Sequence, residues 1–196
     1  MSTEIIIAGK KPAVYRRGLA HYYPALPDFI TLPEAHAIFE AASRTSTRDY
    51  LLFSLLWHTG LRVSEALSLT LDSIRGTDIK VVGKGGKERY IPVEPSLIND
   101  LLRYAMETGI TYHKRILAIT RSHAHRLLNQ YAVRAGIDRP LHCHLFRHGF
   151  AVNFLKQVPN LVYLQELLGH SSIETTRIYT RAALPDVRHA LSQVVF

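Results

Sequence analysis

The sequence predicts a mainly helical α+β fold with a small antiparallel β-sheet. Apolar residues recur at helical spacing through most of the chain after residue 30. Two short runs between Asp78 and Val93, rich in Ile, Val and Tyr, instead flank a glycine-rich turn, which is typical of a β-hairpin. A chain of 196 residues, 47% of them hydrophobic, is long enough to form one domain with a substantial core.

Capping residues indicate where the first helices begin and end. Thr31 and Glu34 form a capping box, so a helix should begin there and end by Ser43. A second helix should cover residues 47–58 and end at Gly60. Because this second helix is apolar on nearly every side, it should be the central helix of the core.

A third helix should begin at Val63, directly after Arg62. A cation is unfavourable at the start of a helix because of the helix dipole. Arg62 therefore needs a local partner, which is either Glu65, three residues further on, or a bound anion.

The hairpin should pair residues 78–82 with residues 89–93 across the turn Gly83-Lys84-Gly85-Gly86-Lys87. After it, amphipathic helices are expected over residues 95–106 and 122–134. The inward-facing residues expected in the second of these helices are Ala124, Leu127, Leu128, Tyr131 and Ala132. Residues 108–119 are ambiguous, and residues 115–119 within them are expected to form either a short strand or the start of a helix.

The last third of the chain carries the polar residues that suggest chemistry. His144 and Arg147 are three residues apart and therefore share one face of a helix. A helix over residues 161–168 should end at Gly169.

A further helix should follow a capping box formed by Ser171 and Glu174. Tyr179 should lie in this helix, about two turns on. These helix ends and faces can bring histidines, an arginine and a phenol together.

Such a set of residues suits phosphoryl transfer to tyrosine. A phenol with a pKa near ~10 is a weak nucleophile at neutral pH and needs a base or a positive field. A phosphodiester under attack gains negative charge on its non-bridging oxygens, which a guanidinium group matches in shape and charge.

Composition supports a polyanionic partner. Lys and Arg number 24 against 16 Asp and Glu, which gives a net charge of +8, and such a balance favours nucleic acid. Cys143 is the single cysteine, so an internal disulfide is excluded. No apolar run approaches the roughly 20 residues of a membrane span, and residues 5–8 are too short for a signal-peptide core. We therefore expect a cytoplasmic protein with no membrane partner.

Three stretches resemble the tyrosine recombinases of the phage integrase family. Residues 144–179 contain H-x-x-R-H, then L-L-G-H and, nine residues later, a tyrosine. This order resembles the C-terminal signature of that family. T-G-L-R-V-S-E-A-L resembles its first arginine box, and V-x-G-K-G-x-K-E-R-x-I-P-V resembles its β-hairpin. The resemblance covers residues 32–179 and implies the catalytic fold of this family. Six residues occur in the order of the family's catalytic residues: Arg62, Lys84, His144, Arg147, His170 and Tyr179.

The resemblance implies a role for each of these residues. Arg62 and Arg147 would hold the non-bridging oxygens of one DNA phosphate, and Tyr179 would attack it to form a 3′-phosphotyrosyl link. Lys84 would protonate the departing 5′-oxygen, and His144 would assist proton transfer at the tyrosine.

His170 would donate a hydrogen bond to the same phosphate, and Glu65 and His148 would support the site. The run from His142 to His144 lacks the ligand spacing of a zinc site. We therefore expect neither a metal nor a cofactor.

The implied partner is double-stranded DNA with specific recombination sites. Lys87 and Arg89 in the hairpin are expected to contact the DNA backbone. His123 and Arg126 lie on the outer face of the predicted helix 122–134, which either meets the major groove or is simply solvated. Other protomers should join on DNA in a tetrameric synapse.

Three segments are expected: a basic arm or linker over residues 1–28, the catalytic domain over residues 29–182, and a tail helix over residues 183–196. The arm either is solvated or follows a phosphate backbone. The tail packs either on its own domain or on a neighbouring protomer. Because many members of the family carry a core-site-binding domain before the catalytic domain, the chain is expected to be of the catalytic-domain-only type or part of a longer protein.

Two other functions are compatible with the same residues. A type IB topoisomerase uses a similar set to nick and relax DNA. A DNA-binding regulator could keep the fold without turnover, although the presence of all six residues argues against it.

Overall fold

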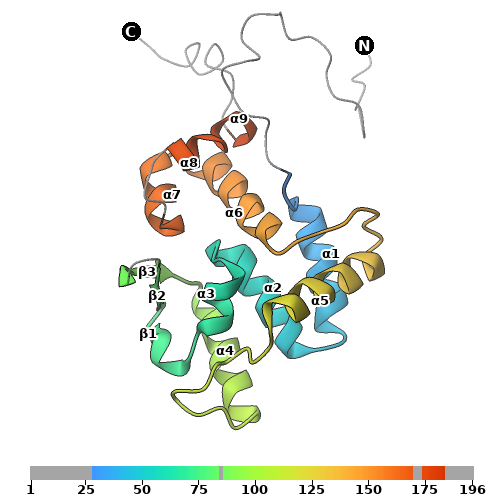
Figure 1. Ribbon diagram of the computed structural model, residues 1–196, viewed down its shortest axis with the longest axis vertical. Coiled ribbons are helices and arrows are strands. Elements are labelled where there is room, and N and C mark those ends of the chain that lie inside the picture. Colours follow the sequence, from blue (N-terminus) through green and yellow to red (C-terminus); the bar gives the residue numbers. More distant parts are fainter. Residues whose placement is uncertain (1–27, 84–85, 170–173, 184–196) are drawn as a thin grey trace, which may run out of the picture.

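The computed structural model describes residues 28–83, 86–169 and 174–183 (Figure 1). The described helices and strands are α1 Leu32–Ser43, α2 Thr47–Thr59, α3 Val63–Ser68, the 3-10 helix η1 Leu71–Ser73, β1 Ile74–Arg75, β2 Asp78–Val82, β3 Glu88–Pro92, α4 Pro95–Glu107, α5 Arg121–Arg134, α6 His144–Gln157, α7 Leu161–Leu168, α8 Glu174–Arg177 and α9 Thr180–Ala183. The expected mainly helical fold with a small antiparallel sheet is confirmed. The expected arm and tail helix, together with Lys84, His170 and Ser171, fall outside the described residues.

Helix α2 is the centre of the core, as its apolar sequence predicts. It packs against α1, α3, α4 and α6, and nine of its 13 residues are buried. Figure 1 shows α6 to α9 on one side of this helix and α1, α4 and α5 on the other, with the sheet at one edge. The position of α2 explains its composition, because a helix covered on several sides cannot present a polar face.

The first two helices begin and end at the signals that predict them. Thr31 caps α1 in a complete capping box with Glu34, whose carboxylate accepts a 2.7 Å hydrogen bond from the backbone N–H of Thr31. Gly60 ends α2 in the left-handed conformation, with φ of 62°. A residue with a side chain would be strained there, and its Cβ would also collide with Phe150 of α6.

The sheet has the order β1-β2-β3, and both pairs of strands are antiparallel. The hairpin has the predicted location, with Ile79 opposite Ile91 and Val81 opposite Arg89. Its second strand begins one residue earlier than expected. Strand β1 was not predicted, because two residues are too few to show alternation.

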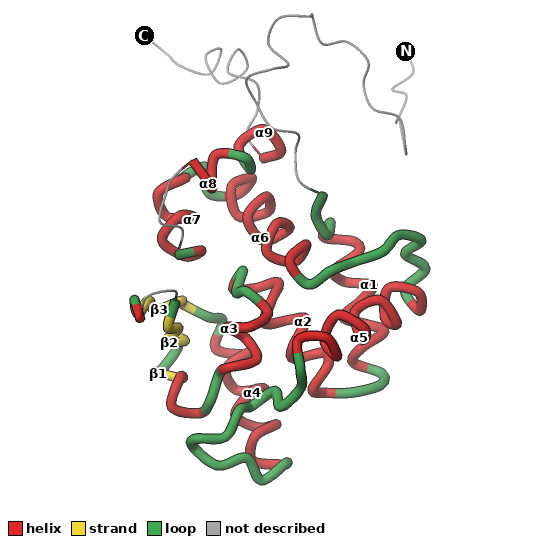
Figure 2. Tube along the Cα trace, in the orientation of Figure 1, coloured by secondary structure: helices red, strands yellow, loops and turns green. Residues whose placement is uncertain are grey.

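The segment between α4 and α5 forms neither of the two elements considered for residues 115–119. It is an irregular connection (Figure 2), held by an isolated bridge between Thr70 and Arg115. The backbone N–H of Ile116 also donates to the carbonyl of Leu69 at 2.9 Å. The apolar run that suggested an element is explained by burial, because Ile116 and Leu117 lie in the core.

The expectation that Tyr179 lies within the helix after Glu174 is wrong. Helix α8 ends at Arg177, and Tyr179 occupies the turn between α8 and α9. Its N–H donates to the carbonyl of Thr176 at 3.1 Å, and its carbonyl accepts from Ala183 at 3.2 Å. The β-branched residues in this stretch lower its helix propensity, so a turn competes well with a continuous helix.

Gly149 allows α6 to approach the core closely. A Cβ at this position would lie 2.7 Å from Cζ3 of Trp57 and closer still to the carbonyl oxygen of Ile30. We expect Gly149→Ala to lower the free energy of unfolding by about 2 kcal/mol, even though alanine favours helix, because backbone and an indole ring must move.

Denaturant unfolding would measure this loss. Gly136→Ala is the matched control: φ is 71° there, but a Cβ would meet nothing within 4 Å, so only backbone strain of about 1 kcal/mol is expected. An equal or smaller loss for Gly149→Ala would contradict the close approach of α6.

Candidate active site

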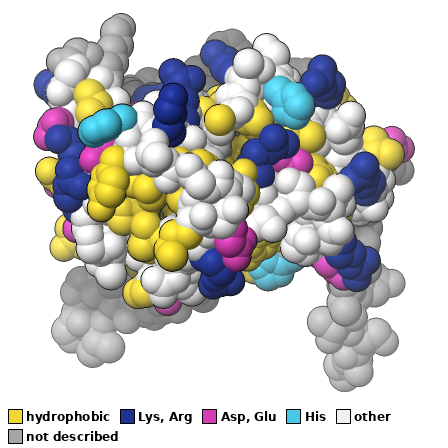
Figure 3. All heavy atoms as spheres, turned by 90° about the horizontal axis from the view of Figure 1, so that it is seen from below, with side chains coloured by type: hydrophobic (Ala, Val, Ile, Leu, Met, Phe, Trp, Pro, Cys, Tyr) yellow, Lys and Arg dark blue, Asp and Glu magenta, His cyan; other side chains and the backbone are white. Residues whose placement is uncertain are grey.

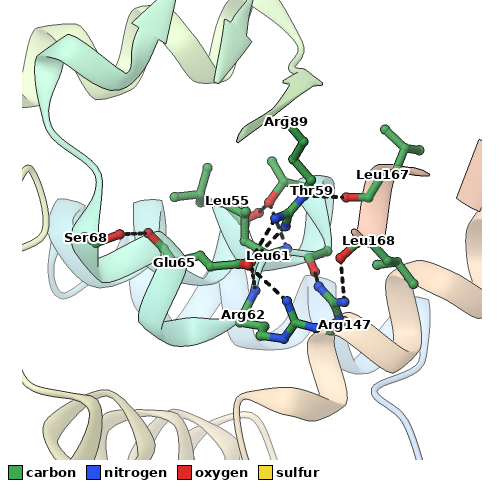
Figure 4. A network of polar contacts seen from close by, with 11 residues as sticks. Leu55, Thr59, Leu61, Arg62, Glu65, Ser68, Arg89, Arg147, Leu167 and Leu168 are labelled. Carbon is green, nitrogen blue, oxygen red and sulfur yellow. Dashed lines mark hydrogen bonds and ion pairs between the residues drawn. The ribbon is translucent and has the colours of Figure 1, made fainter. Parts of the chain in front are cut away.

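The C-terminal ends of α2 and α7 meet at Arg147 of α6 (Figure 4). Its Nη1 donates to the carbonyl of Gly60 at the end of α2, and its Nη2 donates to the carbonyl of Leu168 at the end of α7, both at 2.8 Å. Carbonyls at helix C-termini lack partners within the helix and carry partial negative charge, so a guanidinium satisfies them well. Arg147 is thereby held in one orientation, and it is only 1% exposed.

Arg147 forms no ion pair with a carboxylate in the part of the chain that the structure describes. Burial, and next the positive charge of Arg62, lower the pKa of Arg147 to about 10. The side chain is still protonated at neutral pH. A buried cation without a carboxylate is costly, which makes this position well suited to an anionic ligand.

Arg62 occupies the N-cap position of α3 and pairs with Glu65 in the way its spacing favours. The carboxylate of Glu65 accepts from the backbone N–H of Arg62 at 2.9 Å and from its Nη1 at 3.1 Å. The Arg62 side chain is nevertheless 41% exposed, while that of Glu65 is 8% exposed. Arg62 can therefore keep this pair and still present its guanidinium to an anion.

Arg89 of β3 binds the same carboxylate from the other side. Its Nη1 and Nη2 donate to Oε1 and Oε2 of Glu65 at 3.1 and 2.9 Å. Burial alone would raise the pKa of Glu65, but the hydrogen bonds from Arg89 and from the backbone of Arg62 outweigh it and hold the pKa below its ordinary value. Among the described residues, one carboxylate thus faces the guanidiniums of Arg62, Arg89 and Arg147, and the cluster keeps excess positive charge.

The phenol of Tyr179 lies beside this cluster. Its hydroxyl is 2.7 Å from Nδ1 of His148, and Tyr179 is 2% exposed. Burial raises the pKa of Tyr179, and the nearby charges of Arg147 and Arg62 act in the opposite direction. The two arginines therefore stabilise the phenolate that a nucleophilic attack requires.

His148 is neutral at physiological pH. Burial, and next the ring of His144, lower the pKa of His148 from 6.5 to about 4, and the two rings meet edge to face with centroids 4.6 Å apart. Nδ1 of a neutral imidazole protonated on Nε2 accepts a proton. In the tautomer that carries its proton on Nε2, His148 accepts the hydrogen bond of the Tyr179 hydroxyl and can then take its proton.

The structure brings most of the predicted site residues together. Arg62, Glu65, Arg147, His148 and Tyr179 form one continuous set. Lys84 and His170 lie outside the described residues.

The structure differs from the expectation at the tyrosine. His148, expected only to support the site, contacts the hydroxyl, whereas His144 reaches His148 instead. The four-residue spacing of His144 and His148 indicates that the two rings lie on one face of a helix, but no signal in the sequence indicates which of them meets Tyr179.

The residues expected to contact DNA have different surroundings. Lys87 is exposed, and Arg126 donates to His123 at 2.9 Å along the outer face of α5. Their role stays a prediction. Arg89, by contrast, points into the site, where its guanidinium is bound by Glu65 and by the carbonyl of Leu167. This arrangement does not fit a residue that reaches out to the DNA backbone.

The excess of basic residues is not gathered into one patch on the face opposite α6 to α9. Seen from below Figure 1, Lys and Arg side chains are spread among hydrophobic and uncharged ones (Figure 3). Three arginines, Arg62, Arg89 and Arg147, converge instead at the helix ends around Glu65. This cluster of arginines around Glu65 is therefore stronger evidence for a phosphate partner than the net charge of the chain.

In the part of the chain that the structure describes, no group of His, Cys, Asp and Glu side chains could hold a metal ion. Cys143 is buried, which raises the pKa of its thiol to about 12. None of the described helices has the length and apolar character needed to cross a membrane.

Comparisons with known proteins agree with this geometry. Residues 28–184 match the phage integrase family. The chain is 36% identical over 195 residues to the tyrosine recombinase XerD of Chlorobaculum tepidum, covering 89% of this chain and 63% of that protein. It spans between half and a little under two thirds of the length of the curated relatives it matches.

Two solved structures have the same fold. The catalytic domain of bacteriophage HP1 integrase matches with a TM-score of 0.68 at 25% identity, over 85% of this chain and 94% of that domain. The XerH site-specific recombinase in its post-cleavage complex with palindromic difH substrate matches with a TM-score of 0.72 at 25% identity, over 86% of this chain and 53% of that one.

The lowered pKa of His148 makes stability depend on pH. Between pH 6.5 and about 4 the unfolded chain binds a proton at this residue that the folded protein does not. Its contribution to stability is therefore complete above pH 6.5 and is lost as the pH falls towards 4. We expect this loss to be roughly 2 kcal/mol, after allowance for partial exposure of the ring.

Denaturant unfolding across this pH range would measure the effect. His148→Gln removes the titrating group and should flatten the profile by about that amount, while the histidines that do not contact His148 contribute equally to both proteins. Parallel profiles for the two proteins would contradict a neutral, buried His148.

Proposed function

This chain belongs to the phage integrase family, and we propose that it is a tyrosine-type site-specific recombinase that cleaves and rejoins DNA through a 3′-phosphotyrosyl intermediate. The observation that carries the proposal is the 2.7 Å contact between the Tyr179 hydroxyl and neutral His148, beside the buried cation of Arg147. A phenol paired with a base and next to an unneutralised guanidinium is suited to attack a phosphodiester.

Arg147 and Arg62 would bind the phosphate. Two of the five N–H donors of Arg147 are used by carbonyls, so the others can bind non-bridging oxygens. Arg62 would contribute a second guanidinium from the N-terminus of α3. As the phosphorus becomes five-coordinate these oxygens gain charge, and fixed donors then stabilise the transition state more than the ground state.

The proton of Tyr179 would pass to Nδ1 of His148 as the phenol oxygen bonds to phosphorus. The bond to the 5′-oxygen breaks, and Lys84 would protonate this leaving group. His170 would donate to the phosphate. One phosphodiester replaces another, so the link can later be attacked by a different 5′-hydroxyl without an energy source or a cofactor.

The candidate active site is closed to solvent around Arg147 and Tyr179 in the structure. Arg147 is 1% and Tyr179 2% exposed, so a DNA phosphate cannot reach either without a change in the surrounding chain. Binding of the correct DNA would then open the site. This coupling would also limit contact of the phosphotyrosyl bond with water, whose attack would leave a permanent break.

The partners we propose are double-stranded DNA with specific recombination sites and further protomers in a tetrameric synapse. The XerH complex with difH substrate supports a DNA partner by similarity. The same proposal includes a catalytic domain over residues 29–182, flanked by a DNA-contacting arm and a tail that packs on a neighbouring protomer. It also includes a cytoplasmic location.

Tyr179→Phe tests the nucleophile. On nicked suicide DNA carrying the cognate site, wild-type protein should form a covalent complex that resists denaturation, and Tyr179→Phe should form none while its affinity for DNA changes by less than about twofold. The phenol oxygen is the only atom removed. A covalent band that persists in the variant would move the nucleophile elsewhere.

A supercoiled plasmid with two sites separates recombination from the other activities. Strand exchange between the sites is the expected product. Relaxation without exchange would support a topoisomerase, and tight binding without a covalent band would support a regulator.

A further inference from the structure

Arg89 reaches from the hairpin into the phosphate site. It lies on β3 opposite Val81, and its side chain is only 14% exposed. Two of its nitrogens bind the carboxylate of Glu65, and its Nε donates to the carbonyl of Leu167 at 3.1 Å (Figure 4). Arg89 thus joins three segments that are distant in the sequence: β3, α3 and the end of α7.

The end of α7 is shaped around this side chain. Arg89 satisfies the carbonyl of Leu167, and Arg147 satisfies that of Leu168. A Cβ on the next residue, Gly169, would lie 3.1 Å from the Cδ, Nε and Nη1 atoms of Arg89. Glycine at this position therefore leaves room for the guanidinium and allows the left-handed turn, with φ of 64°, that ends the helix.

Arg89 also controls how strongly Glu65 neutralises Arg62. The carboxylate makes two contacts with Arg89 and only one with the guanidinium of Arg62. A bidentate pair is the stronger one, so most of the negative charge is directed to Arg89. Without this partner the carboxylate would be free to pair fully with Arg62 and draw it away from an anion.

We propose that Arg89 is a positioning residue for DNA cleavage, which orients Arg62 through Glu65 and fastens the hairpin to the end of α7 without contacting DNA itself. The inference rests on the proposed function. The turn of the hairpin closes between Gly83 and Lys87, with a 2.8 Å backbone hydrogen bond from the N–H of Gly83 to the carbonyl of Lys87. Lys84 lies between them in the sequence, so Arg89 ties the base of the Lys84 turn to the residues that would hold the phosphate.

The experiment compares Arg89→Met with Lys87→Met in the full chain. Both variants lose one positive charge from the same hairpin, but Lys87 is exposed and Arg89 is not. The measurements are the dissociation constant for site DNA at several salt concentrations and the single-turnover rate of covalent complex formation on nicked DNA. A residue that contacts a phosphate lowers the salt dependence of binding by about one unit of slope when it is removed.

We expect Arg89→Met to keep the salt slope of the wild type and an affinity within about twofold, while cleavage slows on the order of 100-fold. Lys87→Met should show the opposite pattern, with a slope lower by about one and a smaller effect on cleavage. Arg89→Lys should restore only part of the rate, because an ammonium cannot bind both oxygens of Glu65 and the carbonyl of Leu167 in the same planar geometry.

A double variant distinguishes positioning from general stabilisation. If Arg89 acts through Glu65, adding Glu65→Gln to Arg89→Met should slow cleavage little further, because one pathway is already broken. Multiplying effects would mean that the two residues act independently and would overturn the proposal. If Arg89→Met melts below the assay temperature, Arg89→Gln takes its place, since its amide can still donate to a carboxylate.

Two further results would overturn the proposal: a salt slope that falls by about one in Arg89→Met, as in Lys87→Met, or an unchanged rate of cleavage. Wild-type protein that binds DNA but forms no covalent complex would contradict the proposed function instead. In that case the salt slopes still decide whether Arg89 contacts DNA.

Discussion

The site depends on a buried guanidinium that is held by backbone carbonyls and not by a carboxylate. Arg147 joins the ends of α2 and α7 through Gly60 and Leu168. These carbonyls orient the side chain, and their partial charges offset only part of its positive charge. A carboxylate in their place would fix the arginine equally well but would neutralise it. Helix ends thus allow the fold to keep a cation that is fixed but not neutralised, which a phosphate could bind once the surrounding chain opens.

The other groups are arranged around this cation. Helix α6 carries Arg147 and, as its next residue, His148, so the hydrogen bond of His148 to Tyr179 places the phenol beside the cation. Glu65 is shared between Arg62 and Arg89, so its single negative charge neutralises neither guanidinium fully. The result is a site with excess positive charge, a neutral base and a phenol that are already adjacent before any substrate binds. Once DNA has opened the site, this preorganisation would reduce the rearrangement that the chemical step requires.

Local features of the fold were predictable from the sequence, and contacts between distant residues were not. The capping box at Thr31 and the glycine that ends α2 act within a few residues, and so does the pair of Arg62 with Glu65. The contacts of Arg147 with Gly60, of His148 with Tyr179 and of Arg89 with Glu65 span 87, 31 and 24 residues. No periodicity encodes these distances, since they follow from how the helices pack. The match to the family's motifs indicated which residues gather, but it did not indicate which histidine meets the tyrosine or that Arg89 turns inward.

The most direct test of this account is a cycle of two changes that removes the charge of Arg147 and the charge of its phosphate. Arg147→Gln supplies the first, and a neutral methylphosphonate at the scissile position of the site DNA supplies the second, both in a Tyr179→Phe background that prevents cleavage. Affinity would be measured for all four combinations, after melting curves confirm that the variants are folded. The account predicts that each change alone weakens binding and that the two together weaken it little more than one, with a coupling energy of about 1–2 kcal/mol. Losses that simply add would show that Arg147 does not meet this phosphate and would contradict the central claim.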